Sequence, residues 1–197
     1  MAKTSKSVGR KWLVCLLLLG TMGATAHAQK LKSISVALQT ESIAFPFTRL
    51  SPMHPGIELG VTLGEKEKPK STRRWNAYLG WFYHKNIDQN FYVRGEYQFA
   101  YDIKNTIGIN VPVGLGYMHT FNSQPVFEQQ DNGSFERKTQ LGNARVIVNL
   151  GLGLSYLKLD KVEPFIKYEV VAQSPFVATV PVGVRSFLKI GTTIKLK

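Results

Sequence analysis

The stretch INVPVGLGYM at residues 109–118 decides the fold class of this chain. Side chains of an extended chain point alternately to opposite faces, so every second residue shares a face. One face receives only apolar side chains, which are those of Ile109, Val111, Val113, Leu115 and Tyr117. The other face receives Asn110, Pro112, Gly114, Gly116 and Met118. We therefore predict a strand with one fully apolar face and one nearly bare face, and the fold must explain both.

Seven other segments alternate in the same way, and none of them has the 3.6-residue period of a helix. They are residues 33–41, 57–64, 74–84, 91–101, 144–156, 165–173 and 182–196. Their apolar faces carry no charged residue. The opposite faces carry charges of both signs, at Glu41, Glu58, Arg94, Glu96, Arg145, Lys167, Glu169, Arg185, Lys189 and Lys195.

This pattern predicts an all-β protein, an eight-stranded antiparallel up-and-down transmembrane β-barrel. Such a barrel turns its apolar face to lipid and its polar face to a lumen, which eight strands leave just wide enough for side chains. The glycines and mixed charges suit that space, and no open pore is expected. A soluble periplasmic lipocalin-like binding barrel stays an alternative, in which the apolar face lines a ligand pocket. Pro112 is expected at a strand entry or a bulge, where a missing N–H is tolerated.

Residues 1–28 have the three parts of a secretory signal peptide. A basic opening precedes the apolar run 12–19, and the small residues Ala26 and Ala28 follow it. The run is shorter than the ~20 residues of a transmembrane helix. Cleavage near Ala28 leaves residues 29–197 as one barrel domain, without the chain's single cysteine, Cys15. We therefore expect export and a fold without disulfides or cysteine-ligated metal.

The two longest connections between segments are the first, residues 42–56, and the fifth, residues 119–143. Successive connections of an up-and-down barrel alternate between its two ends, so these two odd-numbered connections lie at the same end. Outer-membrane barrels have long extracellular loops and short periplasmic turns, so we expect these two loops outside the cell. Asp131-Asn132-Gly133 predicts a tight hairpin turn in the second loop. Candidate binding residues in that loop are Phe121, Phe127, Phe135, Arg137 and Lys138. Residues 65–74 are expected to form a solvated periplasmic turn.

The chain has a formal net charge of +12 but no recognisable nucleic-acid motif. Anionic lipid or polysaccharide is a more natural partner for an exported basic protein. Aromatic and basic residues of the long loop suit sugar rings, lipopolysaccharide phosphates or an extracellular protein ligand. The lumen charges are expected to pair with one another, because a confined charge needs a partner. These charges are Glu58, Arg94, Glu96, Arg145, Lys167, Glu169 and Arg185, and a proton or ion pathway is the alternative.

With its signal peptide, its eight strands and the run from Ile109 to Tyr117, the chain resembles the small outer-membrane β-barrel proteins of Gram-negative bacteria. It is most similar to the Bacteroidetes-type outer-membrane β-barrel domain, in which a hydrophobic-Pro-hydrophobic strand entry is frequent. The resemblance implies a location in the cell outer membrane, in contact with its lipid and lipopolysaccharide. It also implies a structural or surface-binding role, which we expect of a monomer.

Some barrels of this size are lipid A enzymes, so catalysis is the competing function. The His-x-Ser motif of the lipid A deacylases is not present in this sequence. The remaining candidates are Ser51 and His54 in the first long loop, with His54 as a base toward Ser51 or as a phosphate contact. A rigid Pro- and Gly-rich turn explains the same residues. No metal-ligand cluster or phosphate-binding glycine loop is evident. We expect no enzyme, no metal and no cofactor, with a lipid A hydrolase or acyltransferase as the alternative.

Overall fold

The structure is a computed structural model that describes residues 31–43, 53–85, 87–124, 127–129, 133–137, 142–176 and 180–196. The expected signal peptide, residues 1–28, lies outside these ranges, as do Ser51 and Lys138. Within the described ranges, no helix has both the length and the apolar character needed to cross a membrane.

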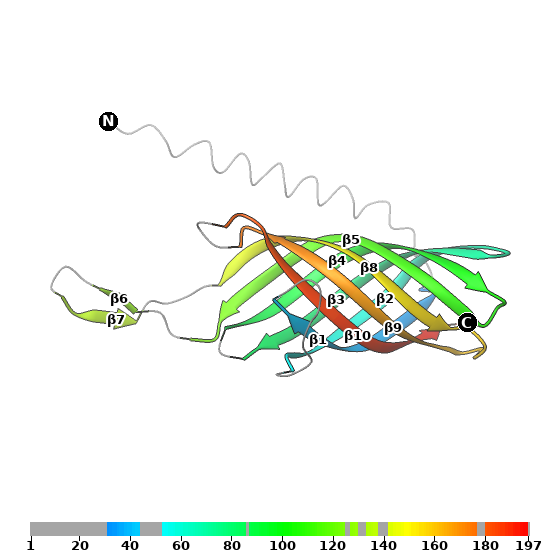
Figure 1. Cartoon of the computed structure of the whole chain (residues 1–197), viewed down its shortest axis with the longest axis horizontal. Coiled ribbons are helices and arrows are strands. Elements are labelled where there is room, and N and C mark those ends of the chain that lie inside the picture. The colour runs from blue at the N-terminus through cyan, green and yellow to red at the C-terminus, as the bar shows by residue number, and fades with distance from the viewer. Residues whose placement is uncertain are drawn as a thin grey trace, which may run out of the picture. The chain divides into compact units, whose positions relative to one another are not determined.

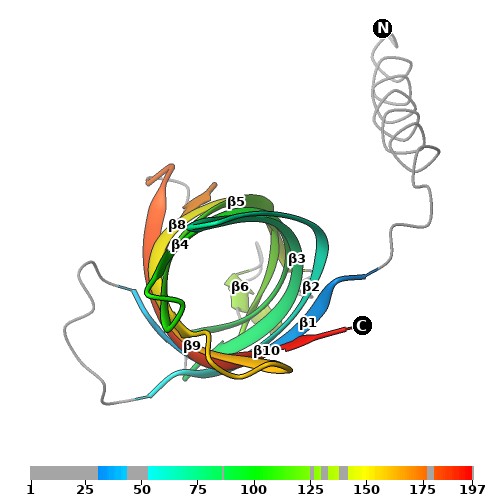
Figure 2. The same cartoon turned by 90° about the vertical axis from the view of Figure 1, so that its right-hand side faces the viewer.

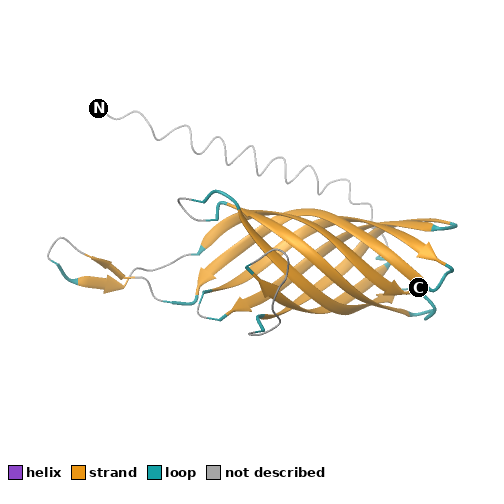
Figure 3. Cartoon of the chain, in the orientation of Figure 1, coloured by secondary structure: helices purple, strands orange, loops and turns teal. Residues whose placement is uncertain are grey.

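Eight strands close into one antiparallel barrel, and Figure 2 shows the ring viewed along its axis. They are β1 (Ser33–Ser42), β2 (Pro55–Lys68), β3 (Ser71–His84), β4 (Asp88–Ile103), β5 (Ile107–Asn122), β8 (Asn143–Tyr156), β9 (Val162–Ser174) and β10 (Gly183–Lys195). Each strand pairs with the next barrel strand along the chain, and β1 pairs with β10 to close the sheet. Figure 3 shows that the described elements are all strands. The predicted eight-stranded up-and-down fold is confirmed.

The connections divide between the two ends of the barrel (Figure 1). The loop end carries the connections β1–β2, β3–β4, β5–β8 and β9–β10. The turn end carries the short turns β2–β3, β4–β5 and β8–β9, together with the start of β1 and the end of β10. The two longest connections therefore share one end, as predicted. Within the β5–β8 connection, β6 (Phe127–Gln129) and β7 (Phe135–Arg137) pair as a separate two-stranded sheet, which is the expected hairpin.

The barrel has the reverse polarity of a soluble protein. Outward side chains such as Leu79, Leu115 and Leu150 are about 60% exposed, whereas most lumen side chains are polar or charged and buried. The alternation is strict along β8, where Asn149 is buried and Leu150 is exposed. An apolar outer surface that surrounds the whole barrel is stable against hydrocarbon and unstable in water. The polarity is that of a membrane-spanning barrel and argues against the lipocalin-like alternative.

Residues 109–118 lie in the middle of β5, with their bare face in the lumen. Pro112 is therefore not at a strand entry, and the β5–β8 register on either side of it does not shift, so it is not at a bulge. Instead, the residue pairs between β5 and β8 are interrupted at Val111 and Pro112. A side chain on Gly151 of β8 would come within 3.1 Å of the proline ring. The sheet thus accepts the missing donor because the facing glycine leaves room for the ring.

The strands are longer than the sequence pattern predicted, and residues 65–74 are not a solvated turn. Most of this segment belongs to β2 and β3, which are joined by a tight turn after Lys68. The Arg74 side chain lies on the lumen side and is only 11% exposed rather than solvated. The prediction was wrong because the outer faces of these strand ends are polar, which hides the period-2 signal.

Candidate functional site

The centre of the lumen holds a neutral network of three acids and three bases. Its members, called the central network below, are Glu58, Arg94, Glu96, Lys167, Glu169 and Lys189. They come from β2, β4, β9 and β10, so the contacts cross the lumen instead of following one pair of strands. All six side chains are at least 95% buried. Equal numbers of opposite charges allow this burial without an uncompensated ion.

Arg94 is the hub of the central network. Its Nη1 donates to Glu169 Oε2 at 2.6 Å, and its Nη2 lies 2.9 Å from Glu58 Oε2 and 3.2 Å from Glu96 Oε2. The guanidinium also stacks over Tyr78, with 4.8 Å from Cζ to the ring centroid. Lys189 binds the same two glutamates as Arg94, Glu58 at 2.7 Å and Glu169 at 2.9 Å. Each charge is thus held from several directions, which fixes the side chains in place.

Lumen glycines make room for these large side chains. A Cβ built on Gly80 would lie 2.1 Å from Cζ of Tyr92, and one built on Gly114 would lie 2.3 Å from Oδ1 of Asn149. Tyr92 in turn donates its hydroxyl to Glu58. The bare face of the strands therefore exists because rings and charged chains from other strands fill the space above it.

An apolar layer lies between the central network and the loop end. It consists of Phe82, Tyr92, Met118, Ile147, Val171 and Phe187, all buried. Strand β10 shows the order, because its successive lumen-facing residues are Arg185, Phe187 and Lys189. The space left beside this layer is a cavity of about 10 Å³. That volume is at the lower limit for a single water molecule, so the layer is closely packed.

A second polar group, the loop-end cluster, lies above the apolar layer. It consists of Glu41, His54, His84, Asp88 and Arg185. Arg185 joins the two acids, with Nη1 at 2.8 Å from Glu41 Oε1 and Nη2 bound to Asp88. His84 Nδ1 lies 2.6 Å from Glu41 Oε2. The imidazole rings of the two histidines stack with their centroids 3.5 Å apart.

The turn end is closed by a third polar contact. Both terminal nitrogens of Arg74 donate hydrogen bonds to Glu163 at 2.9 Å, and its Nε donates one to Glu65 at 2.7 Å. Between this contact and the central network lies a chain of neutral polar groups. Thr62 donates to Asn76 at 2.8 Å, and Gln98 donates to Asn110 at 3.1 Å. The described lumen is therefore filled from one end to the other.

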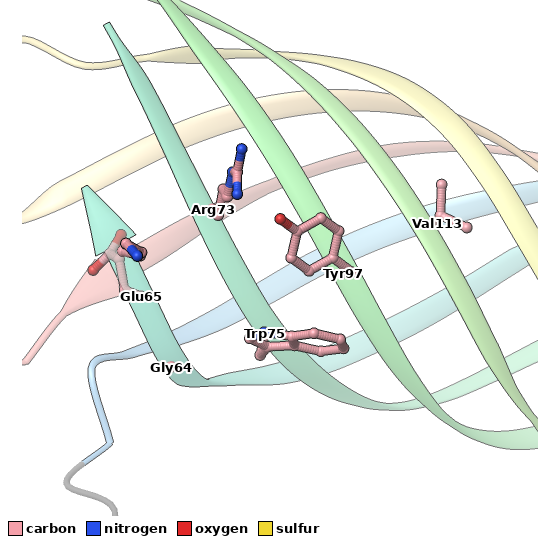
Figure 4. Close-up of a pocket in the computed structure, with 7 residues that line it drawn as sticks. Gly64, Glu65, Arg73, Trp75, Tyr97 and Val113 are labelled. Carbon is pink, nitrogen blue, oxygen red and sulfur yellow. The ribbon is translucent and has the colours of Figure 1, made fainter. Parts of the chain in front are cut away.

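A hollow lies on the outer surface near the turn end, as shown in Figure 4. It has a volume of about 780 Å³ and follows one row of residues across four strands, Gly64, Trp75, Tyr97 and Val113. The Trp75 and Tyr97 rings lie 4.8 Å apart between centroids. Lys66 and Arg73 add positive charge beside them. An aromatic floor with basic neighbours suits the boundary between hydrocarbon and lipid headgroups.

Five of the seven lumen charges predicted from the sequence lie in the central network, namely Glu58, Arg94, Glu96, Lys167 and Glu169. The other two do not. Arg185 belongs to the loop-end cluster, and Arg145 donates to Gln173 at 3.1 Å. Sequence reasoning placed Lys189 and Glu41 on the polar face but not in a site, and it missed Asp88, His84 and the pair of Arg74 with Glu163.

The other predicted site residues lie at the loop end. His54 directly precedes β2, beside Glu41 and His84, whereas its expected partner Ser51 lies outside the described residues. Phe121 stands near the end of β5 with its ring 4.7 Å from that of His119. The backbones of Phe127 and Arg137 are paired between β6 and β7. The side chain of Phe135 is 67% exposed. Lys138 lies outside the described part of the chain.

Comparisons with known proteins identify the fold. No protein-family model matches the chain. No curated protein sequence matches it either. Among solved structures, Neisserial surface protein A superimposes with a TM-score of 0.53 at 11% identity, over 84% of this chain and 96% of that chain. The fold is that of the small bacterial outer-membrane β-barrels.

Two further solved structures match this barrel. The attachment invasion locus protein Ail of Yersinia pestis has a TM-score of 0.49 at 12% identity, over 84% of this chain and 98% of that chain. The outer membrane enzyme PagL has a TM-score of 0.49 at 12% identity, over 83% of this chain and 99% of that chain. Identities of 11–12% concern the fold and not the function.

Proposed function

We propose that this chain is an integral outer-membrane barrel with a sealed lumen, which serves as a rigid scaffold for its loop-end connections. The observation that supports this most directly is the filled lumen, with a neutral central network beneath an apolar layer. Moving an ion through it would require breaking several buried ion pairs. A closed sheet has no free strand edge, which favours a monomer.

The binding role belongs to the loop end. The wall is constrained by lipid outside and by packed side chains inside, so recognition falls to loops held on the rigid barrel. Residues 123–142 are the longest connection, and exposed Phe135 with Arg137 and Lys138 suits sugar rings or phosphate groups at the cell surface. We propose a glycan or lipopolysaccharide ligand at this loop.

The test separates binding from insertion. Removal of residues 124–140 should leave a barrel that still migrates faster in gels when unheated than when boiled, with binding to lipopolysaccharide vesicles lost. Removal of residues 44–50 from the first loop is the matched control and should preserve that binding. If the barrel without residues 124–140 binds as the intact protein does, the loop is only a connector. Discrete single-channel conductance of the intact protein in planar bilayers would contradict the sealed lumen.

The lipid A enzyme is the competing function. His54 has a carboxylate neighbour, because its Nδ1 lies 4.0 Å from Glu41 Oε2, but the same atom contacts the Glu41 backbone oxygen at 2.9 Å. This contact at Nδ1 leaves Nε2 as the atom that would act as a base toward a nucleophile, so the contact itself does not decide for or against catalysis. Mass spectrometry of lipid A from cells with and without the protein should show the same acyl pattern. A changed pattern that His54→Ala abolishes would favour the enzyme.

A further inference from the structure

We propose that Glu41, His54 and His84 form a binding site for a divalent transition-metal ion, with zinc as the representative ion. Each residue offers one ligand atom, and these atoms all lie within 4.8 Å of one another. Imidazole nitrogen and carboxylate oxygen are the protein ligands that zinc takes most readily after thiolate. The site is independent of the surface-binding role proposed above.

The barrel register explains why the three residues meet. Gly56 of β2 pairs with Phe82 of β3, so two residues further toward the loop end His54 faces His84. Thr40 of β1 pairs with Pro55, and the backbone N–H of Glu41 donates to the His54 carbonyl at 3.1 Å. One cross-strand row therefore carries a carboxylate and two imidazoles on its lumen side.

The three ligand atoms lie close together even without an ion. His84 Nδ1 lies 2.6 Å from Glu41 Oε2, and His54 Nδ1 lies 4.0 Å from the same oxygen. The two rings are nearly parallel, with an interplanar angle of 17°. Each Nδ1 faces an oxygen acceptor and so carries the proton in the neutral ring. When an ion binds, each ring gives its Nδ1 proton to water and takes a proton from water at Nε2, and the rings rotate so that the Nδ1 lone pairs and Oε2 face the metal.

Arg185 orients the carboxylate for this purpose. It binds Glu41 Oε1 at 2.8 Å and leaves Oε2 to the histidines. Its charge is shared with Asp88, so Glu41 keeps negative charge for a cation. Arg145, which donates to Gln173, adds positive charge at this end and weakens the site. We therefore expect moderate rather than tight metal affinity. Partners that hold a ligand in this way commonly change metal affinity by ~10–100-fold when they are removed.

The site is open to the loop end. The side chains of His54 and His84 are 12% and 11% exposed, whereas Glu41 is fully buried. An ion enters from the mouth of the barrel, and water completes its coordination. Glu41 and His54 stand on either side of the β1–β2 connection, so the bound ion ties both ends of that connection to β3. Metal binding should therefore raise the melting temperature of the barrel.

The experiment is calorimetric titration of the folded full-length protein, carrying no histidine tag, with zinc chloride. We expect one site, with affinity reduced at least about tenfold in His84→Ala and in His54→Ala. His119→Ala is the matched control, because His119 is hydrogen-bonded to Tyr117 near the loop end and lies outside the row. Copper(II) in place of zinc should show nitrogen couplings in electron paramagnetic resonance, lost in the double variant His54→Ala/His84→Ala.

Two controls distinguish specific zinc binding from nonspecific binding and from misfolding. Calcium and magnesium, which prefer oxygen ligands, should not compete with zinc. Unheated gel mobility identifies any variant that fails to fold, and His54→Gln and His84→Gln then replace the alanine variants. The proposal is overturned if the intact protein binds no zinc, if the folded His54 and His84 variants bind as the intact protein does, or if His119→Ala weakens binding equally.

Discussion

Arg94 Nη1 lies 2.6 Å from Glu169 Oε2, although the two residues belong to strands that are not neighbours in the sheet. Strand β4 pairs with β3 and β5, and β9 pairs with β8 and β10. The ion pair therefore crosses the lumen and connects two walls of the barrel that are separated by β5 and β8. In a barrel too narrow for water to fill, such cross-lumen contacts take the place of an apolar core.

Arg94→Met should destabilise the barrel by about 3–5 kcal/mol, the usual cost of leaving buried partners uncompensated. Three glutamates would then face two lysines in the central network. The double variant Arg94→Met/Glu169→Met keeps the network neutral and should lose less than Arg94→Met alone. Urea unfolding in lipid vesicles, followed by tryptophan fluorescence, measures both. A double variant less stable than either single variant would show that the pair is not the source of the stability.

Gly80→Ala should cost about 1–3 kcal/mol, the range for overpacking of a filled interior. The new methyl group overlaps the Tyr92 ring, which must move away from Glu58. Gly95→Ala is the control, because nothing lies within 4 Å of a Cβ at Gly95. Equal stability of the two variants in the same unfolding assay would mean that Gly80 does not make room for Tyr92.

Arg73 and Arg74 are adjacent residues with opposite environments. Arg74 binds Glu163 and Glu65 in the lumen, so Arg74→Ala should cost about 2–3 kcal/mol, the scale of lost hydrogen bonds to charged groups. Arg73 points outward and is exposed, so Arg73→Ala should change stability by no more than about 0.5 kcal/mol. Thermal unfolding in detergent compares the two, and a larger loss for Arg73→Ala would reverse the assignment of faces.

The alternation of residues was sufficient to predict the fold. Each of the eight segments overlaps one barrel strand, and INVPVGLGYM points its bare face inward as expected. Strand ends were less predictable, because polar outer faces there resemble turns. Asp88 and Glu163 were assigned to connections, although both are lumen residues at the strand ends.

The sites depend on register, which a single sequence does not specify. Arg94 and Glu169 are both polar-face residues, but only the arrangement of strands around the ring decides that they meet. The same holds for Glu41, His54 and His84, whose common row follows from the β1–β2 and β2–β3 pairings. His54 was paired with Ser51 from closeness in the sequence, whereas its observed neighbours are 13 and 30 residues away.

The most direct test of the membrane barrel uses two adjacent residues of β8. Spin labels are attached at Leu150→Cys and at Asn149→Cys, in a chain with Cys15→Ser and reconstituted in lipid vesicles. Leu150 is 58% exposed on the outside, and Asn149 is 1% exposed in the lumen. Oxygen, which concentrates in lipid, should relax the label at position 150 strongly and a water-soluble nickel complex should not, while both should reach position 149 poorly. Strong relaxation at position 150 by the nickel complex would place the apolar face in water and contradict the account.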